Sequence, residues 1–381
     1  MASNSTGWLY RNLENSVIRI IQKQELKEEA SDCWINEITQ IGSYNWDASG
    51  GCTIFVPGRA RPYRAENESK QLELKKDNRV QMVDENRDRQ PNYPLESLFR
   101  AVKLCTPEFS FNEVNFVTDR NNLRKLFNFV VGSADKSFRV DFHKIKNTIA
   151  FIRQEEKTKE ICNDYGKCFE NQFTTFDNIS KGSHRRIITY NFADFKMVVR
   201  FEVDCIEPEL STAMSKMRIA AKDKTDDSAT NYSKKFDNSE LSYQVIGDEV
   251  LNQDTLMELT TKSIYKGNRD FPRHKWDQLF FSQTHCLVIG WHKFGTLQQV
   301  QKYTFKDVSK ECGKTKQNTE NFLKKLYHLL STIKSLPNEE NKDRVFSIIY
   351  DHAADSKVLK VYLCEKKVFG AIPDTLIKEI F

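Results

Sequence analysis

The segment Met197-Val-Val-Arg-Phe-Glu-Val-Asp204 is the most informative part of this chain for its fold and its site. It is rich in apolar and β-branched residues, and a turn signal follows at Pro208, so it predicts a strand. Side chains alternate between the two faces of a strand. One face therefore carries Val198, Arg200, Glu202 and Asp204. The other face carries Met197, Val199, Phe201 and Val203.

Two carboxylates side by side on one strand face need an explanation. Glu202 and Asp204 repel each other, and burial makes their charges costly unless a cation neutralises them. A divalent metal is the simplest such cation, because hard cations prefer carboxylate oxygens. The alternative is a strand edge that faces water, where such a pair has no function.

Three other segments supply partners for this pair. Glu170 ends the segment Asp164-Tyr-Gly-Lys-Cys-Phe-Glu170, in which Asp164 is a residue type that begins helices. The segment 256–262 predicts a strand, and one of its faces carries Glu258, Thr260 and Lys262. Gln278 lies at the end of a predicted helix that leads into a buried strand. Such carboxylates with a lysine nearby are typical of a metal-dependent nuclease core.

In this order, the motifs resemble those of the decapping exoribonuclease family (DXO-like and Rai-like), and of its fungal branch in particular. The resemblance spans roughly residues 40 to 300. The segments that carry it are Arg120, Gly166-Lys-Cys-Phe-Glu170, Glu202-Val-Asp204, Glu258-Leu-Thr260, Gln278 and Gly290. Each motif is short, and their order makes the signal specific.

The resemblance implies a role for each of these residues. One or two Mg²⁺ or Mn²⁺ ions are expected to bind Glu170, Glu202, Asp204, Glu258 and the backbone carbonyl of Leu259. Catalytic roles are expected for Glu202, Asp204, Glu258 and Gln278. Substrate contacts are expected from Arg120, Glu202, Thr260 and Gln278. Arg120 would hold the 5′ phosphate of RNA, since guanidinium groups suit phosphate.

One position departs from the family pattern. Thr260 stands where the family carries a lysine, and a hydroxyl cannot supply a positive charge. Lys262, two residues further on the same strand face, is predicted to take over this catalytic role. The alternative is a catalytically weakened member that binds RNA 5′ ends or partners an exonuclease. An unrelated prenyl-diphosphate synthase is disfavoured, because only residues 84–88 approach its Asp-rich motif.

The resemblance also implies an activity. We expect a hydrolase that removes incomplete or non-canonical caps, such as nicotinamide-dinucleotide caps, or 5′ pyrophosphate, in mRNA 5′-end quality control. The family combines these activities with 5′→3′ exoribonuclease digestion in different mixtures. The expected partners are RNA 5′ ends and a 5′→3′ exoribonuclease, and the expected compartment is the nucleus, with the cytoplasm as the alternative.

Composition agrees with an enzyme that has no membrane segment. The chain has 381 residues and a formal net charge of +5, so nucleic acid would be bound by a local basic cleft. It contains no apolar run long enough to span a membrane, and no secretory signal is expected at the N-terminus. The nine cysteines form no Cys-x-x-Cys pair, which predicts free thiols and no zinc site.

Residues 1–381 are expected to form a single mixed α/β domain. It would contain two sheets with flanking helices and resemble the PD-(D/E)xK nuclease core. Polar insertions are expected near 65–92 and 211–243. The first forty residues have helical features, and further helices are expected at 95–105, 122–131 and 318–335. Further strands are expected at 41–46, 53–57, 138–142, 148–153, 345–350 and 358–363. Arg124 and Lys125 are expected on a soluble helix face, and Arg185 and Arg186 in a solvated turn.

Overall fold

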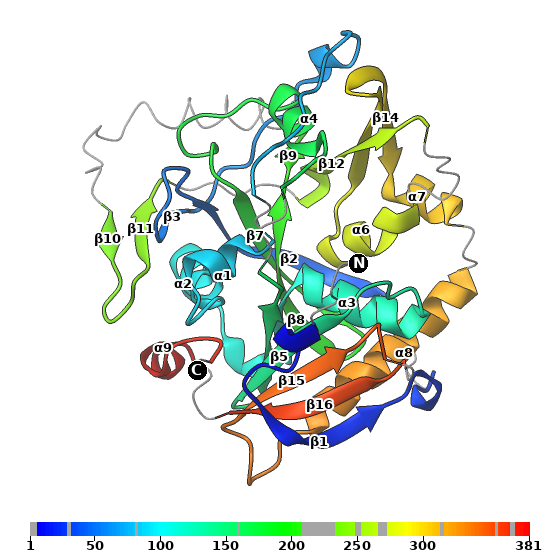
Figure 1. Cartoon of the computed structure of the whole chain (residues 1–381). Coiled ribbons are helices and arrows are strands. Elements are labelled where there is room, and N and C mark those ends of the chain that lie inside the picture. Colours follow the sequence, from blue (N-terminus) through cyan, green and yellow to red (C-terminus); the bar gives the residue numbers. More distant parts are fainter. Residues whose placement is uncertain are drawn as a thin grey trace.

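Two β-sheets with helices around them make up the computed structural model of the chain (Figure 1). The structure describes residues 6–28, 32–80, 83–157, 161–207, 233–247, 253–265, 273–312, 316–354, 357–365 and 370–381. This mixed architecture of helices and two sheets is the one expected from the sequence. In the described part of the chain, no helix has the length and apolar character needed to cross a membrane.

The larger sheet has twelve strands in the order β1-β16-β15-β5-β6-β4-β8-β7-β2-β3-β11-β10. Its strands run over Leu13–Ile21 (β1), Ile35–Trp46 (β2), Thr53–Val56 (β3), Phe116–Asp119 (β4), Phe138–Ile145 (β5), Thr148–Gln154 (β6), His184–Phe192 (β7), Phe195–Val203 (β8), Lys234–Lys235 (β10), Ser242–Val245 (β11), Val345–Tyr350 (β15) and Leu359–Cys364 (β16). The smaller sheet has the order β14-β13-β12-β9. Its strands are Cys205–Ile206 (β9), Leu256–Ser263 (β12), Cys286–Lys293 (β13) and Thr296–Thr304 (β14).

Strand β8 lies inside the larger sheet, where it pairs with parallel β4 and antiparallel β7. Its side chains alternate as the sequence predicts. Val198 packs in the core on one face of the sheet. Met197, Val199, Phe201 and Val203 pack in the core on the other face. Arg200, on the Val198 face, is fully buried and forms a two-pronged ion pair with Asp119 of β4. This alternation fixes the side of the sheet on which Glu202 lies.

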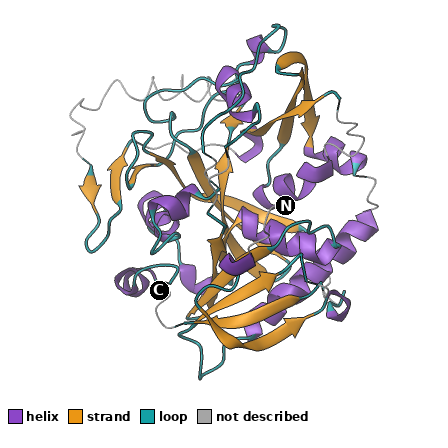
Figure 2. Cartoon of the chain, in the orientation of Figure 1, coloured by secondary structure: helices purple, strands orange, loops and turns teal. Residues whose placement is uncertain are grey.

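Helices cover both faces of the larger sheet (Figure 2). The α-helices are Glu85–Arg89 (α1), Glu96–Cys105 (α2), Arg120–Val131 (α3), Gly166–Gln172 (α4), Trp276–Ser282 (α6), Phe305–Glu311 (α7), Lys316–Ser335 (α8) and Asp374–Ile380 (α9). Short 3₁₀ turns are Thr6–Trp8, Lys23–Glu25, Ala65–Asn67, Phe111–Glu113, Gln253–Thr255 and Arg273–Lys275, the last of which is η6. Apolar residues of α3, α6 and α8 share one core, and those of α2 and α9 share the other.

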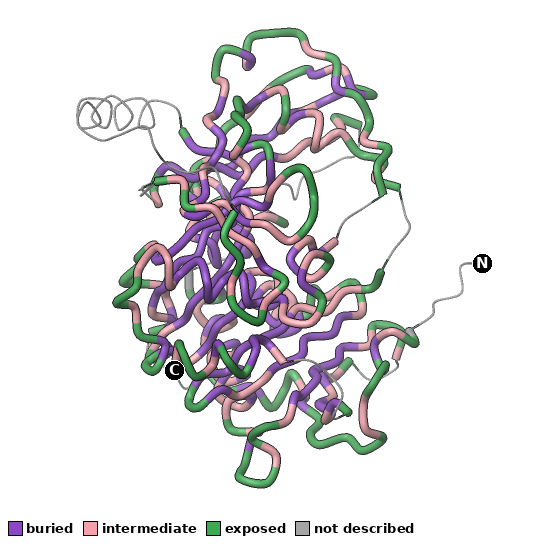
Figure 3. The backbone as a smooth tube through the Cα atoms, turned by 90° about the vertical axis from the view of Figure 1, so that its left-hand side faces the viewer, coloured by how far each residue is buried: buried purple, intermediate pink, exposed green. Residues whose placement is uncertain are grey.

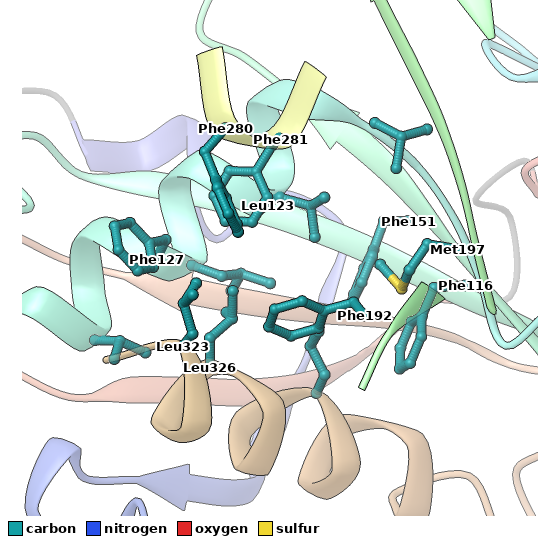
Figure 4. Close-up of a cluster of buried hydrophobic side chains, with 14 of the residues drawn as sticks. Phe116, Leu123, Phe127, Phe151, Phe192, Met197, Phe280, Phe281, Leu323 and Leu326 are labelled. Atoms are coloured by element: carbon teal, nitrogen blue, oxygen red, sulfur yellow. The ribbon is translucent and has the colours of Figure 1, made fainter. Parts of the chain in front are cut away.

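The core between the larger sheet and α3, α6 and α8 is rich in aromatic rings. Figure 4 shows Leu123 and Phe127 of α3, Phe280 and Phe281 of α6, and Leu323 and Leu326 of α8 in this core, with Phe151 and Met197 of the sheet to one side of them. Buried segments concentrate in the middle of the molecule (Figure 3). Burying such large side chains is the main stabilising contribution to a fold of this size. The same packing holds α3 and α6 rigidly, and both helices begin beside the acidic residues described below.

Between β8 and β9 the chain passes from the larger sheet to the smaller one through one residue. Strand β8 ends at Val203 and β9 begins at Cys205, so Asp204 is the link between the two sheets. Strand β9 then pairs antiparallel with β12, through Cys205 with Met257 and Ile206 with Leu256. The backbone path therefore brings Asp204 next to β12, which carries Glu258.

One expectation about the elements was wrong. The described residues among the first forty contain no α-helix: β1 and the start of β2 lie there, with two short 3₁₀ turns. The β-branched residues of β1 satisfy their backbone by pairing with β16, a contact that local sequence cannot reveal. Within 65–92, where a polar insertion was predicted, Asn86 and Gln90 are buried and hydrogen-bonded. Within 211–243, residues 211–232 lie outside the described residues, and β10 begins in the remainder.

Candidate active site

Four acidic residues from different elements meet where the two sheets join. Glu202 lies near the end of β8, Asp204 follows it, Glu258 lies in β12 and Glu170 in α4. Strands β9 and β12 and helix α4 are neighbours in Figure 1. Burial, then repulsion from Glu258, Glu170 and Glu202, raises the pKa of Asp204 well above its usual range. The sequence therefore identified residues that act on one another.

Asp204 is held by the backbone of β12. Its Oδ2 accepts a hydrogen bond of 2.8 Å from the amide of Leu259. Strand β9 pairs with β12 only through Leu256 and Met257, so the edge of β12 at Leu259 is open to Asp204. The amide and carbonyl of one strand residue point toward the same edge. The Leu259 carbonyl therefore faces the side of Asp204, as a backbone metal ligand would require.

Glu258 is the most enclosed of the four carboxylates, with 6% of its surface exposed. Gln278 donates its side-chain N–H to Oε1, and Lys275 Nζ lies 3.2 Å from the same oxygen. Arg120 Nη1 lies 3.7 Å from Oε2. An unpaired carboxylate at this depth would be strongly unfavourable, and these three donors supply its partners.

Sequence reasoning missed Lys275. It ends η6, and Gln278 follows in α6 one helical turn later. This i,i+3 spacing places both side chains on one side of the helix start. Lys275 Nζ also lies 3.2 Å from Gln278 Oε1, so the two residues and Glu258 form one hydrogen-bonded triangle. The spacing from Gln278 was the available signal in the sequence.

Glu202 is paired across the larger sheet with Arg185 of β7. The two residues are direct neighbours in the antiparallel register, and Arg185 Nη1 donates to Glu202 Oε2 at 2.8 Å. Arg185 also donates to Glu85 of α1 at 3.1 Å. Burial alone would raise the pKa of Glu202, but Arg185, Lys167 and Arg120 lower it below its usual value. The expected solvated turn at Arg185 and Arg186 was wrong, because both residues lie buried in β7.

Glu170 is paired with a lysine of its own helix. Lys167 Nζ lies 2.7 Å from Glu170 Oε2, at the i,i+3 spacing of α4. Burial is the main cause that raises the pKa of Glu170; Glu202 raises it further, and Lys167 opposes both. Helix α4 lies close over β13 because Gly290 has no side chain: a Cβ there would meet the Phe169 ring at 2.6 Å. Gly290 therefore sets the position of α4, and with it Glu170.

Arg120 begins α3 beside this group. Its Nη1 donates to Ser282 Oγ at 3.2 Å, and its guanidinium lies 5.8 Å from the centre of the Phe201 ring. These contacts place a planar cation next to Glu258, as phosphate recognition would require. Arg124 and Lys125 lie further along the helix and pair with Asp277 at 3.1 Å and Glu155 at 2.9 Å. They join elements together and are more than the soluble helix face expected from the sequence.

Two predicted site residues lie further along β12. Thr260 shares the strand face of Glu258 at a spacing of about 7 Å, and Lys262 at about 13 Å, from the rise per strand residue. Both are half-buried. The catalytic role of Lys262 and the substrate contact of Thr260 stay predictions. Lys275, which lies within hydrogen-bond distance of Glu258, is the better placed cation.

The donor set fits a divalent metal ion. Carboxylate and carbonyl oxygens are the ligands that Mg²⁺ and Mn²⁺ prefer. Three of the carboxylates are turned toward basic side chains, and among the described residues no three His, Cys, Asp or Glu side chains converge as ligands. Burial, with repulsion from neighbouring carboxylates, raises the pKa of Asp204 and Glu170, and a bound cation would relieve that repulsion. Binding would thus require side-chain rotations away from Lys167, Arg185 and Lys275.

The chain belongs to a protein family described as a domain of unknown function (DUF8563), whose model matches residues 15–381. No curated protein matches it in sequence.

Its fold is that of the fungal Rai1 and Dxo1 proteins, as the resemblance in sequence implied. Schizosaccharomyces pombe Rai1, solved with 3′-FADP, is 16% identical with a TM-score of 0.58, covering 91% of this chain and 99% of that one. Scheffersomyces stipitis Rai1, solved with (3′-NADP)⁺ and calcium, is 13% identical with a TM-score of 0.65, covering 95% and 100%. Candida albicans Rai1, solved with pU5 and Mn²⁺, is 11% identical with a TM-score of 0.61, covering 93% and 97%.

Proposed function

We propose that this protein is a metal-dependent hydrolase that acts at the 5′ end of RNA. The observation that carries the proposal is the meeting of Glu170, Glu202, Asp204 and Glu258 at the junction of the two sheets. The shared fold supports it, since Rai1 proteins of that fold bind pU5 with Mn²⁺ and the dinucleotides 3′-FADP and (3′-NADP)⁺.

In this proposal Glu170, Glu202, Asp204, Glu258 and the Leu259 carbonyl hold one or two Mg²⁺ or Mn²⁺ ions. The bound ions supply an activated water and neutralise the charge that builds on the phosphate. Arg120 binds a 5′ phosphate oxygen, because its guanidinium lies beside the acidic group and is fixed by Ser282. Gln278, fixed by Glu258, orients the water through its amide.

The products would be a 5′-monophosphate RNA and a released leaving group. That group is pyrophosphate, a nucleotide or a cap-like unit, according to the 5′ end on the substrate. We include removal of incomplete caps, of nicotinamide-dinucleotide caps and of 5′ pyrophosphate, and 5′→3′ digestion, within the proposed activities. We also propose that the protein acts in the nucleus, with the cytoplasm as the alternative. A 5′→3′ exoribonuclease is its proposed partner. Imaging of the tagged protein in cells tests the compartment.

The proposal is tested with purified protein, Mn²⁺ or Mg²⁺, and short RNAs that differ only at the 5′ end. The ends are triphosphate, unmethylated cap, dinucleotide cap and monophosphate. We expect metal-dependent product from at least one RNA, no product without metal, and none from the Glu202→Ala/Asp204→Ala variant. The preferred end then identifies the reaction. Absence of product with every end and both metals would refute the hydrolase.

Thr260 favours one second candidate. A hydroxyl on the Glu258 face supplies no charge, so a catalytically weakened protein that binds RNA 5′ ends is the alternative. Fluorescence anisotropy with the same RNAs separates the two candidates. Binding of 5′ ends without any turnover would favour the binding protein.

A further inference from the structure

The cations around the acidic residues differ in what else they bind. Arg185 lies within the sheet and is shared between Glu202 and Glu85. Lys167 lies on the outside of α4, with 35% of its side chain exposed. Arg120 is tied to Ser282 and lies over Phe201. Lys275 carries a compact ammonium that contacts Glu258, the most enclosed carboxylate. The same ammonium also donates to Gln278, a second residue of the site.

The backbone at Lys275 is fixed by its neighbour. Trp276 is buried, stacks on Phe280 at 4.7 Å between ring centres, and donates its indole N–H to Ser309 at 3.1 Å. A lysine side chain normally loses much rotamer freedom when it is held in one place. Here the contacts with Glu258 and Gln278 offset the cost of that loss, and the buried Trp276 holds the backbone, so the ammonium keeps its position beside Glu258.

We propose that Lys275 is the positioning residue of the reaction, on the premise that the protein is the proposed RNA 5′-end hydrolase. Its ammonium fixes Glu258 and the Gln278 amide in one arrangement and places a positive charge where phosphate charge develops. A fixed charge of this kind acts more strongly in a partly enclosed site than in water. When a divalent ion takes Glu258, Lys275 stays close because Gln278 Oε1 still accepts its hydrogen bond.

A second position beside Glu258 allows a sharp test. Thr260 shares the face of Glu258 at about 7 Å along β12, from the rise per strand residue. A lysine side chain at position 260 is long enough to reach the Glu258 carboxylate from the other side. Thr260→Lys should therefore restore the charge that Lys275→Met removes, although the two positions lie on different elements.

The first arm measures kcat and KM on the preferred RNA for four proteins: wild type, Lys275→Met, Lys275→Met/Thr260→Lys and Lys306→Met. Lys306 is an exposed lysine of α7, the helix beside η6, and its variant is the matched control. We expect Lys275→Met to lose about 100-fold in kcat, the order of one fixed electrostatic group, with KM within about threefold. We expect the double variant to recover at least about tenfold of that loss, because the charge returns, and Lys306→Met to match wild type.

Wild-type kcat in Lys275→Met would overturn the proposal, and so would a loss that Thr260→Lys does not recover, since that marks a merely structural role. The second arm does not depend on turnover. Lys275 is paired with Glu258 and carries the same sign of charge as the ion. Its removal should therefore make Mn²⁺ bind the metal-free protein about threefold or more tightly. Unchanged Mn²⁺ affinity would overturn the proposal even if wild type hydrolyses no RNA, an outcome that refutes the proposed function separately.

Discussion

At the scale of single residues, the raised pKa of Asp204 determines how pH affects metal binding at this site. Asp204 is held by one backbone amide, while Glu258 and Glu202 each have a basic side chain as partner. Burial and its acidic neighbours therefore raise its pKa, so that it keeps its proton to a higher pH than an ordinary carboxyl. A proton and a metal ion compete for the same oxygens.

The first prediction follows from this competition. As the pH falls through the raised pKa of Asp204, Mn²⁺ affinity should weaken, by up to about tenfold per pH unit for each proton that the ion displaces. The sign follows from the raised pKa of Asp204, since lowering the pH adds a proton that the ion must expel. Isothermal titration calorimetry across this range measures the slope. In Asp204→Asn the pH dependence should become weaker, and an unchanged slope would remove Asp204 from the metal site.

Sequence reasoning at this scale found the acids and missed their partners. Alternation along β8 correctly placed Glu202 apart from Phe201 and Val203. The partners of the acids lie far away in the chain: Arg185 is 17 residues from Glu202, and Lys275 is 17 residues from Glu258. Such contacts arise from strand register and helix placement, which no local pattern specifies. Lys167 is the exception, because it is one helical turn from Glu170.

At the scale of elements, the position of helix α4 depends on a residue of β13 that has no side chain, Gly290. Gly290 pairs within the smaller sheet, and its missing Cβ leaves room for the Phe169 ring. Because Glu170 directly follows Phe169, the closeness of helix and strand decides where this carboxylate lies. The sequence indicated Gly290 through its motif, but only the packing explains why glycine is needed there.

The second prediction is that Gly290→Ala displaces Glu170. The added methyl meets the Phe169 ring at 2.6 Å, and overpacking of this kind costs about 1–3 kcal/mol. Urea unfolding should show that loss, and Mn²⁺ affinity should fall with it. Gly166→Ala is the control, because its methyl meets nothing closer than 3.4 Å and stability should change little. Adding Phe169→Leu should recover part of the loss; if it recovers none, the contact with Phe169 is not the cause.

Element boundaries in the core were predictable, and those of β1 and β2 were not. Strands β5, β6, β15 and β16 contain regular apolar residues that the interior requires, and each lies where the sequence predicted it. Strand β1 lies at the edge of the larger sheet with Val17, Ile18 and Ile20 exposed. An exposed edge strand lacks the alternation of a half-buried one, so its β-branched residues resembled a mixed helix face.

At the scale of the whole molecule, Asp204 joins the two sheets and Glu258 belongs to the smaller one. A cation held by Glu202, Asp204 and Glu258 would therefore link both sheets through one point. Apolar residues of both sheets share one core with α3, α6 and α8, and the other face of the larger sheet packs with α2 and α9. Binding at this junction should stabilise the native state as a whole, because the unfolded chain holds no such group of oxygens.

The third prediction is a gain in global stability on binding. At a free Mn²⁺ concentration about 100 times its Kd, the free energy of unfolding should rise by about 2.7 kcal/mol. Urea unfolding of the wild type with and without Mn²⁺, followed by tryptophan fluorescence, measures this gain. The Asp204→Asn/Glu258→Gln variant serves as the control and should gain nothing. An equal gain in the variant would place the ion elsewhere on the protein.

We propose that Glu170, Glu202, Asp204 and Glu258 form one divalent-metal centre. Mn²⁺ binding followed by electron paramagnetic resonance is the direct test of this claim. Titrating Mn²⁺ into the metal-free protein near pH 8 should remove the signal of the free ion until one or two ions are bound per chain. Asp204→Asn/Glu258→Gln should leave the free-ion signal almost intact at the same concentrations. Equal binding by wild type and variant, or no binding by either, would contradict the claim.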